Sequence, residues 1–106
     1  MSSWKEVAKA VDFAKTDRIL ISLTDLKEVT EIVVFKVDGR YFAIEGSCPH
    51  RGAPWLDGTR LGTTLTCPWH LAEINLTTGA ALKGPLARGV TTYPVREIDG
   101  RIEIEA

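Results

Sequence analysis

β-branched and aromatic residues dominate the chain from residue 18 onward and predict β-strands. They fill segments 18–23, 31–37 and 40–45. Asp38-Gly39 separates the last two segments. Because both central residues of a type I′ turn need positive φ, Asp-Gly between apolar runs indicates a tight hairpin.

The same arrangement recurs at the C-terminal end. Segments 91–98 and 101–105 meet at Asp99-Gly100, which predicts a second hairpin. In the last segment isoleucine alternates with glutamate, so one face should be buried and the other exposed. We expect Pro94 at a strand start or on a sheet edge, because proline has no backbone N–H to donate.

Short strands are also predicted in the middle of the chain, at 60–66 and 72–76, with a turn at Thr77-Thr78-Gly79. Several short strands with regular turns are typical of an all-β fold, and we predict an antiparallel β-sandwich.

The N-terminal segment has a different periodicity. Apolar residues at Trp4, Val7, Ala8, Val11 and Ala14 fit one face of a helix, so we predict a short helix over 4–14.

Length and composition restrict the class of protein. A chain of 106 residues with 44% hydrophobic and 25% charged residues predicts one globular domain, 1–106. The formal net charge is −1 and no run of Lys and Arg appears, which argues against nucleic-acid binding. The first ten residues show no signal peptide, and no apolar stretch approaches the ~18 residues of a membrane span, so we expect a cytoplasmic protein without membrane contact.

The chain places all of its cysteines and histidines in two short loops. Cys48-Pro49-His50 lies in the first loop, 46–58, and Cys67-Pro68-Trp69-His70 opens the second. Both loops fall between predicted strands and are rich in Pro and Gly, so we expect a small ligand-binding subdomain at about 46–85.

Two thiolates and two imidazoles make a four-ligand set. A Cys48–Cys67 disulfide is disfavoured in a reducing cytoplasm and leaves both histidines without a role. Zinc accepts Cys₂His₂, but common structural sites pair Cys with Cys and His with His along the chain. Here each loop carries one of each. This order suits a [2Fe–2S] cluster with both cysteines on one iron and both histidines on the other.

The spacing Cys-x-His, sixteen residues, Cys-x-x-His resembles the motif of Rieske proteins, and the match continues through CPHRGAPWLDG, CPWHLAEINLTTG and KGPLARGV. The chain is similar to small soluble Rieske ferredoxins over its whole length. The resemblance implies that Cys48 and Cys67 bind the inner iron, and that His50 and His70 bind the outer iron through Nδ1.

Departures from high-potential members predict a reduction potential in the low part of the Rieske range, which spans about −150 to +300 mV. The resemblance places Ala53 and Trp69 where those proteins carry two disulfide-bonded cysteines. It places Ala72 and Ile74 where they carry Ser and Tyr hydroxyls. Fewer hydrogen-bond donors to the sulfurs stabilise the reduced cluster less.

Other residues near the motifs have two interpretations. We interpret Trp55 and Trp69 as packing, with a docking patch as the alternative. Leu71, which replaces a common glycine, and Arg51 are interpreted as loop residues, with partner contact as the alternative. Pro85 resembles the proline loop that covers Rieske clusters. We also predict that the backbone conformation of the first loop requires its three glycines, Gly46, Gly52 and Gly58.

The predicted function is one-electron transfer and not catalysis, since no histidine is left for base chemistry and no nucleophile lies beside a base. The resemblance implies a monomeric carrier between an NAD(P)H-dependent flavoprotein reductase and a terminal oxygenase of the aromatic-ring dioxygenase type, with docking near His50 and His70. One alternative is a small Rieske-like subunit of a larger reductase, such as assimilatory nitrite reductase. The other is a non-redox module that binds zinc or no metal.

Overall fold

The computed structural model describes residues 3–25, 28–48, 52–69, 72–84 and 88–105. The strands and 3₁₀ turns of these ranges are, in chain order, β1 (Trp4–Lys9), η1 (Ala10–Phe13), β2 (Arg18–Asp25), β3 (Glu28–Val37), β4 (Arg40–Glu45), η2 (Trp55–Asp57), β5 (Thr59–Leu61), β6 (Thr64–Thr66), β7 (Glu73–Asn75), β8 (Ala81–Lys83), β9 (Thr92–Tyr93), β10 (Val95–Ile98) and β11 (Arg101–Glu105). Within them, no helix has the length and apolar character needed to cross a membrane.

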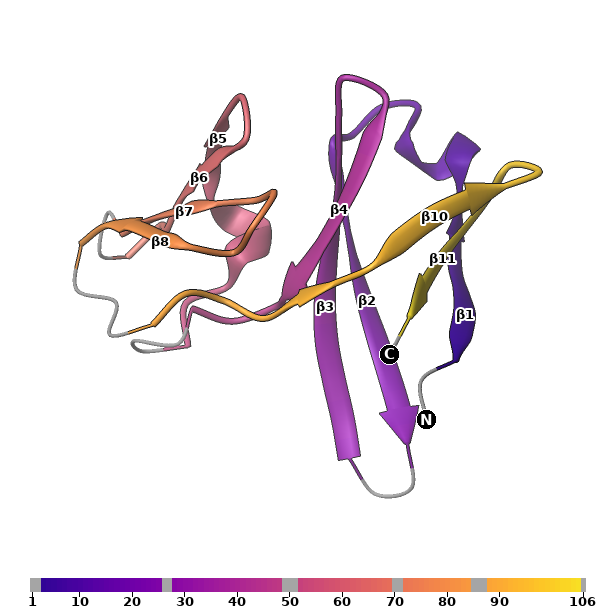
Figure 1. Cartoon of the computed structure of the whole chain (residues 1–106), viewed down its shortest axis with the longest axis horizontal. Helices are drawn as coiled ribbons and strands as arrows, with labels where there is room; N and C mark the ends of the chain where they lie inside the picture. Colours follow the sequence, from indigo (N-terminus) through magenta and orange to yellow (C-terminus); the bar gives the residue numbers. More distant parts are fainter. Residues whose placement is uncertain (1–2, 26–27, 49–51, 70–71, 85–87, 106) are drawn as a thin grey trace.

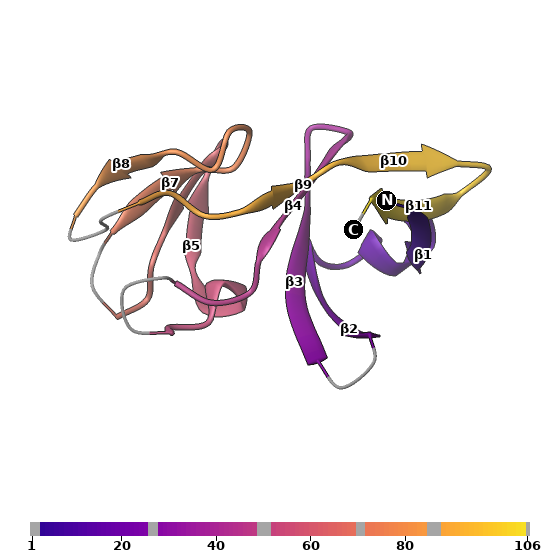
Figure 2. The same ribbon diagram turned by 60° about the horizontal axis from the view of Figure 1, so that its bottom comes forward.

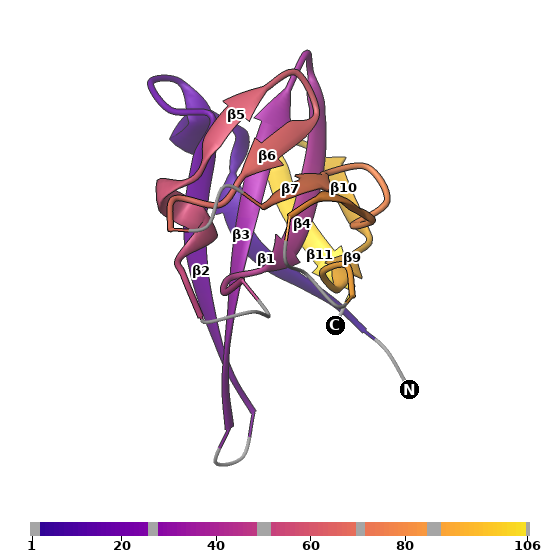
Figure 3. The ribbon, with the colours of Figure 1, turned by 90° about the vertical axis from the view of Figure 1, so that its left-hand side faces the viewer.

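The strands form three antiparallel sheets, which confirms the predicted all-β antiparallel class. A central sheet has the order β2-β3-β4-β9, a terminal sheet the order β1-β11-β10, and a small sheet the order β5-β6-β7-β8. The small sheet and the terminal sheet lie on opposite sides of the central one (Figures 1 and 2). Figure 3 shows the small sheet in front of β2, β3 and β4. The sandwich therefore has a third layer.

The central sheet is buried on both faces, so β3 carries a continuous apolar run and not a clean alternation. Val33 and Phe35 pack toward the small sheet, against residues such as Leu65 and Ile74. Ile32 and Val34 pack toward the terminal sheet, against residues such as Ile102. Each of these side chains contributes about 1.5–3 kcal/mol by leaving water. The ligand loops are thereby attached to a rigid base.

Both predicted Asp-Gly hairpins are confirmed. Asp38 and Gly39 have φ of 51° and 79°, and Asp99 and Gly100 have φ of 51° and 77°. Positive φ at both central positions is the type I′ geometry, whose twist matches that of the strands it joins. The turns set the register of the pairs Val37 with Arg40 and Ile98 with Arg101.

The predicted N-terminal helix is wrong. Residues 4–9 form strand β1, which pairs antiparallel with β11 and shifts register between Glu6 and Ala8, and η1 follows. Strand β1 covers an edge of β11 that would otherwise expose unpaired backbone groups, and this non-local pairing outweighs a short helical pattern. The Arg96 guanidinium lies 4.1 Å from the centroid of the Trp4 ring, and this cation–π contact adds to the attachment of β1. Val11, which a helix would have buried, is 74% exposed.

Two other predicted strands are each divided in two. Segment 60–66 is the hairpin of β5 and β6, and segment 91–98 splits at Pro94 into β9 and β10. Strand β9 pairs with β4 in the central sheet, whereas β10 pairs with β11. Pro94 has no N–H to continue a ladder, but its carbonyl accepts from the N–H of Glu105 at 3.0 Å. This split lets one segment serve two sheets. The predicted strand at 72–76 is confirmed as β7.

Candidate metal centre

Each of the two cysteine loops is closed by a backbone hydrogen bond at the equivalent position. The N–H of Cys48 donates to the carbonyl of Ala53 at 2.8 Å, and the N–H of Cys67 donates to the carbonyl of Ala72 at 2.7 Å. Each cysteine thus begins a six-residue loop that ends at a buried alanine. The repeated Cys-x₄-Ala spacing is the sequence signal of these two loops.

His50 and His70 lie inside these closed loops by sequence, but both fall outside the described residues, as do Arg51, Leu71 and Pro85. Within the part of the chain that the structure describes, no group of three or more His, Cys, Asp and Glu residues could hold a metal. In the described ranges, the site consists of the two cysteines and the residues around them.

Both cysteines are buried in the core that joins the central and small sheets. Cys48 is 1% exposed and Cys67 is fully buried, and neither forms a disulfide. They share this core with residues of both sheets, including Val33, Ile44 and Leu65. The first loop follows β4, the second follows β6, and the packing of the two sheets brings both thiols into one water-excluded core. Two thiols in such a setting suit a soft or borderline metal, such as the iron of a cluster or zinc.

The first loop has a short antiparallel ladder that sets the direction of its side chains. Ser47 bridges to Pro54, and the N–H of Trp55 donates to the carbonyl of Gly46 at 3.0 Å. Cys48 and Trp55 are buried, whereas Ser47 is exposed. The indole Nε1 of Trp55 is also buried and has no hydrogen-bond partner. An acceptor supplied by a sulfur-rich cluster would satisfy this N–H, so the residues present fit such a group.

The predicted roles of the loop glycines are confirmed. A Cβ at Gly46 would lie 3.0 Å from the carbonyl oxygen of Glu31, and one at Gly58 would lie 2.8 Å from that of Thr66. Gly52 has a φ of 77°, and its N–H donates to the Cys48 carbonyl at 2.8 Å. The first loop therefore packs closely against both sheets.

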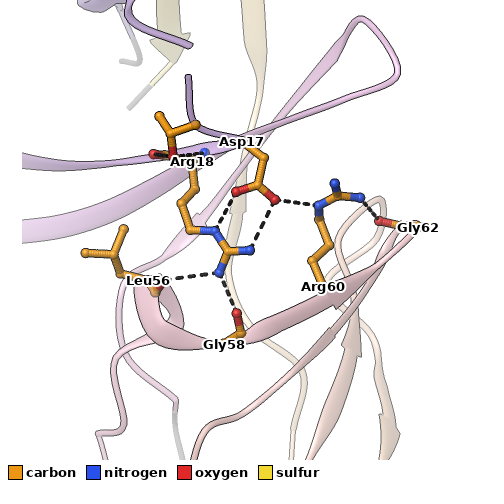
Figure 4. Close-up of polar contacts among 7 residues, drawn as sticks. Asp17, Arg18, Leu56, Gly58, Arg60 and Gly62 are labelled. Carbon is orange, nitrogen blue, oxygen red and sulfur yellow. Dashed lines mark hydrogen bonds and ion pairs between the residues drawn. The ribbon is translucent and has the colours of Figure 1, made fainter. Parts of the chain in front are cut away.

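A network of charged residues attaches the end of the first loop to the central sheet (Figure 4). The guanidinium of Arg18 donates to the carbonyls of Leu56 at 3.1 Å and Gly58 at 2.5 Å. It also donates to both carboxylate oxygens of Asp17, at 2.8 and 3.1 Å, and Arg60 Nε donates to the same carboxylate at 2.7 Å. The hydrogen bond from Arg18 is the main cause that lowers the pKa of Asp17 to about 2. No sequence motif pointed to this network, because Asp17 and Arg18 lie 38 to 43 positions from the residues of the first loop and of β5 that they contact.

The segment after β8 is held at both described ends. Gly84 has a φ of 97°, and a Cβ there would lie 2.6 Å from the Cα of Ala72 at the end of the second loop. At the other end, Arg88 donates to Glu45 at 2.9 Å, and this contact raises the pKa of the Arg88 guanidinium. Gly84 thus lies beside the end of the second loop, and Arg88 is bound next to the start of the first loop.

The tryptophans differ in exposure, and the packing interpretation is correct for only one of them. Trp55 is fully buried, but Trp69, directly before His70, is 60% exposed. Ala72 and Ile74, at the positions of the Ser and Tyr hydroxyls of high-potential members, are fully buried and have no side-chain donor. Ala53, at the position of one of their disulfide cysteines, is fully buried as well. The described surroundings of the thiols are thus apolar, apart from the Trp55 indole.

Comparison with known proteins gives consistent matches. The model of the Rieske [2Fe–2S] domain family matches residues 3–94. The ferredoxin component of the naphthalene 1,2-dioxygenase system of Pseudomonas putida is 28% identical over 102 residues, covering 96% of this chain and 94% of that protein. The ferredoxin subunit of the 3-phenylpropionate/cinnamic acid dioxygenase of Photorhabdus laumondii is 39% identical over 75 residues, covering 70% and 71%.

Solved structures agree with these relatives. The Sphingomonas yanoikuyae B1 ferredoxin superposes with a TM-score of 0.80 at 28% identity, covering 98% of this chain and 99% of that one. A chain from the complex of reduced oxygenase and oxidized ferredoxin in carbazole 1,9a-dioxygenase superposes with a TM-score of 0.82 at 23% identity, covering 95% and 91%. At that identity the second match supports the fold alone.

Proposed function

The chain belongs to the Rieske [2Fe–2S] domain family, and from this membership we propose that Cys48, His50, Cys67 and His70 hold its one Rieske-type cluster. Cys48 and Cys67 bind the inner iron through sulfur, and His50 and His70 bind the outer iron through Nδ1. The observation that carries this assignment is the pair of matching closed loops, each of which presents a buried cysteine to one core.

The protein is a ferredoxin, an electron carrier and not a catalyst. When bound, the cluster supplies a one-electron couple whose potential histidine ligation raises above that of four-cysteine clusters. The chain's own residues keep water from the thiolates and hold the two loops in register. The Arg18 network fixes the first loop on the central sheet, and Gly84 allows the segment after β8 to approach the second.

We propose that the carrier passes electrons from an NAD(P)H-dependent flavoprotein reductase to a terminal oxygenase of the aromatic-ring dioxygenase type. The names of the relatives support an oxygenase partner. Docking takes place on the surface around His50 and His70, and the exposed Trp69 indole supports this location, since aromatic residues are enriched at interfaces. Such encounters are small and transient, which favours fast release after transfer.

Residues 1–106 act as one Rieske domain, with the cluster-binding part at about 46–85. Support comes from the apolar core that runs without a break from the central sheet into the small one. The protein works as a monomer in the cytoplasm, a reducing compartment that keeps cysteine thiols from pairing in disulfides.

The test is electron paramagnetic resonance of the purified protein after reduction with dithionite. A rhombic signal whose average g lies below that of reduced four-cysteine [2Fe–2S] clusters supports mixed His/Cys ligation. His70→Cys and His50→Cys variants should lose this signal, while Trp69→Phe, a substitution outside the ligand set, should keep it. A colourless, silent protein with one zinc per chain would reject the electron carrier and support the zinc-binding module.

A further inference from the structure

Two buried polar side-chain atoms in the described part of the chain have no hydrogen-bond partner: Tyr41 Oη and Trp55 Nε1. Tyr41 lines a cavity of about 270 Å³ beside β9, which is large enough to hold water that could bind its hydroxyl. Trp55 is fully buried in the same apolar core as the two cysteines. Leaving an N–H without an acceptor costs free energy, so the Trp55 indole calls for a specific explanation.

The ladder of the first loop shows which way its side chains project. Cys48 lies opposite Ala53, Ser47 opposite Pro54, and Gly46 opposite Trp55. Directly opposed residues share a face of a ladder, and side chains two positions apart return to the same face. Cys48 and Ala53 therefore project to one face, and Ser47 and Pro54 to the other. Trp55, which begins η2 directly after this bridge, is buried in the same core as Cys48 and Ala53.

Burial agrees with this assignment. Cys48, Ala53 and Trp55 are at most 1% exposed, whereas Ser47 is exposed and Pro54 is partly exposed. Trp55 is the diagonal neighbour of Cys48 across the ladder, a separation of about 7–8 Å between backbones that an aromatic side chain can span.

We propose that the indole N–H of Trp55 donates a hydrogen bond to a sulfur of the cluster held by Cys48 and Cys67, and that this bond raises the reduction potential. The proposal rests on the proposed function, because it needs the cluster in place. Reduction adds negative charge to the cluster, so a donor to its sulfur stabilises the reduced form more than the oxidised form. Trp55 thereby supplies a donor in a site where Ala72 and Ile74 supply none.

The experiment compares Trp55→Phe with Trp4→Phe in the loaded protein by spectroelectrochemical titration. Trp55→Phe keeps an aromatic ring in the core but removes the N–H. It should shift the ratio of reduced to oxidised protein at fixed potential about tenfold toward oxidised, which is about 59 mV for one electron. Trp4→Phe changes an indole on β1 of the terminal sheet and should leave the potential unchanged. An unchanged or higher potential in Trp55→Phe with an intact cluster overturns the proposal.

A second measurement decides the case if Trp55→Phe fails to retain its cluster. Reduced protein labelled with ¹⁵N at the indole nitrogen is examined by pulsed electron–nuclear resonance. Coupling to one labelled indole that persists in Trp69→Phe and in Trp4→Phe supports Trp55 as the donor. Absence of indole coupling in a wild-type protein with a clear Rieske signal overturns the proposal, whereas absence of the Rieske signal itself rejects the proposed function.

Discussion

Asp17→Asn removes the carboxylate that joins Arg18 and Arg60 and so loosens the end of the first cysteine loop. Both guanidinium groups lose their charged acceptor. Asparagine keeps one neutral amide oxygen as an acceptor, and Arg18 keeps the carbonyls of Leu56 and Gly58. The Arg18 side chain also lies over the Phe35 ring at 4.9 Å, so it should stay in place. The variant therefore tests the contribution of the charge more than that of the packing.

The magnitude follows from the pKa of Asp17, which is lowered from 3.8 to about 2. Without screening, this shift corresponds to about 2.4 kcal/mol, at about 1.4 kcal/mol per unit. The Asp17 side chain is 31% exposed, so solvent and salt reduce the contribution to about 1 kcal/mol. Because the folded-state pKa lies below the unfolded value, this stabilisation is fully present above pH 3.8 and is lost as the pH falls through about 2.

The assay is stopped-flow unfolding in concentrated urea, followed by tryptophan fluorescence at two pH values. At neutral pH we expect Asp17→Asn to unfold about fivefold faster than the wild type, if the contact breaks before the transition state. About half of the stabilisation remains near pH 3, so the ratio should fall to about two- to threefold. Glu103→Gln, which removes a carboxylate bound by Arg96 at 2.7 Å on the terminal sheet, is the control and should change the rate less than about twofold. Equal rates at neutral pH, or a ratio that does not fall with pH, would refute the reasoning.

Two further predictions concern the second loop. Gly84→Ala should destabilise the protein by about 2 kcal/mol more than Gly39→Ala, with faster loss of cluster absorbance. Both glycines have positive φ, but only a Cβ at Gly84 would lie 2.6 Å from the Cα of Ala72. Equal urea midpoints of the two variants would contradict this. Ala72→Ser should raise the reduction potential, because it adds a hydroxyl donor at a fully buried position. Ala81→Ser, at an exposed position, should leave the potential unchanged. Equal reduction potentials of the two variants in a redox titration would exclude the idea.

Local residue patterns were enough to predict much of the fold. Asp38-Gly39 and Asp99-Gly100 specify hairpins because few residue pairs accept positive φ at two successive positions. The helical spacing at 4–14 misled because β1 is defined by its pairing with β11, which lies about a hundred residues away. Similarly, Pro94 marked a strand boundary, but only the assembled sheets show that the strands before and after it belong to different layers.

For the site, the order of cysteines and histidines along the chain was sufficient to indicate the family and its cluster, since ligand type and spacing are properties of the sequence. The tertiary structure decided what surrounds the thiols. It placed Arg18 against the carbonyls of the first loop and Trp55 in the same core as Cys48. It also left Trp69 exposed. These relations depend on how three sheets pack and on which way each side chain projects, and no local pattern of residues encodes such long-range geometry.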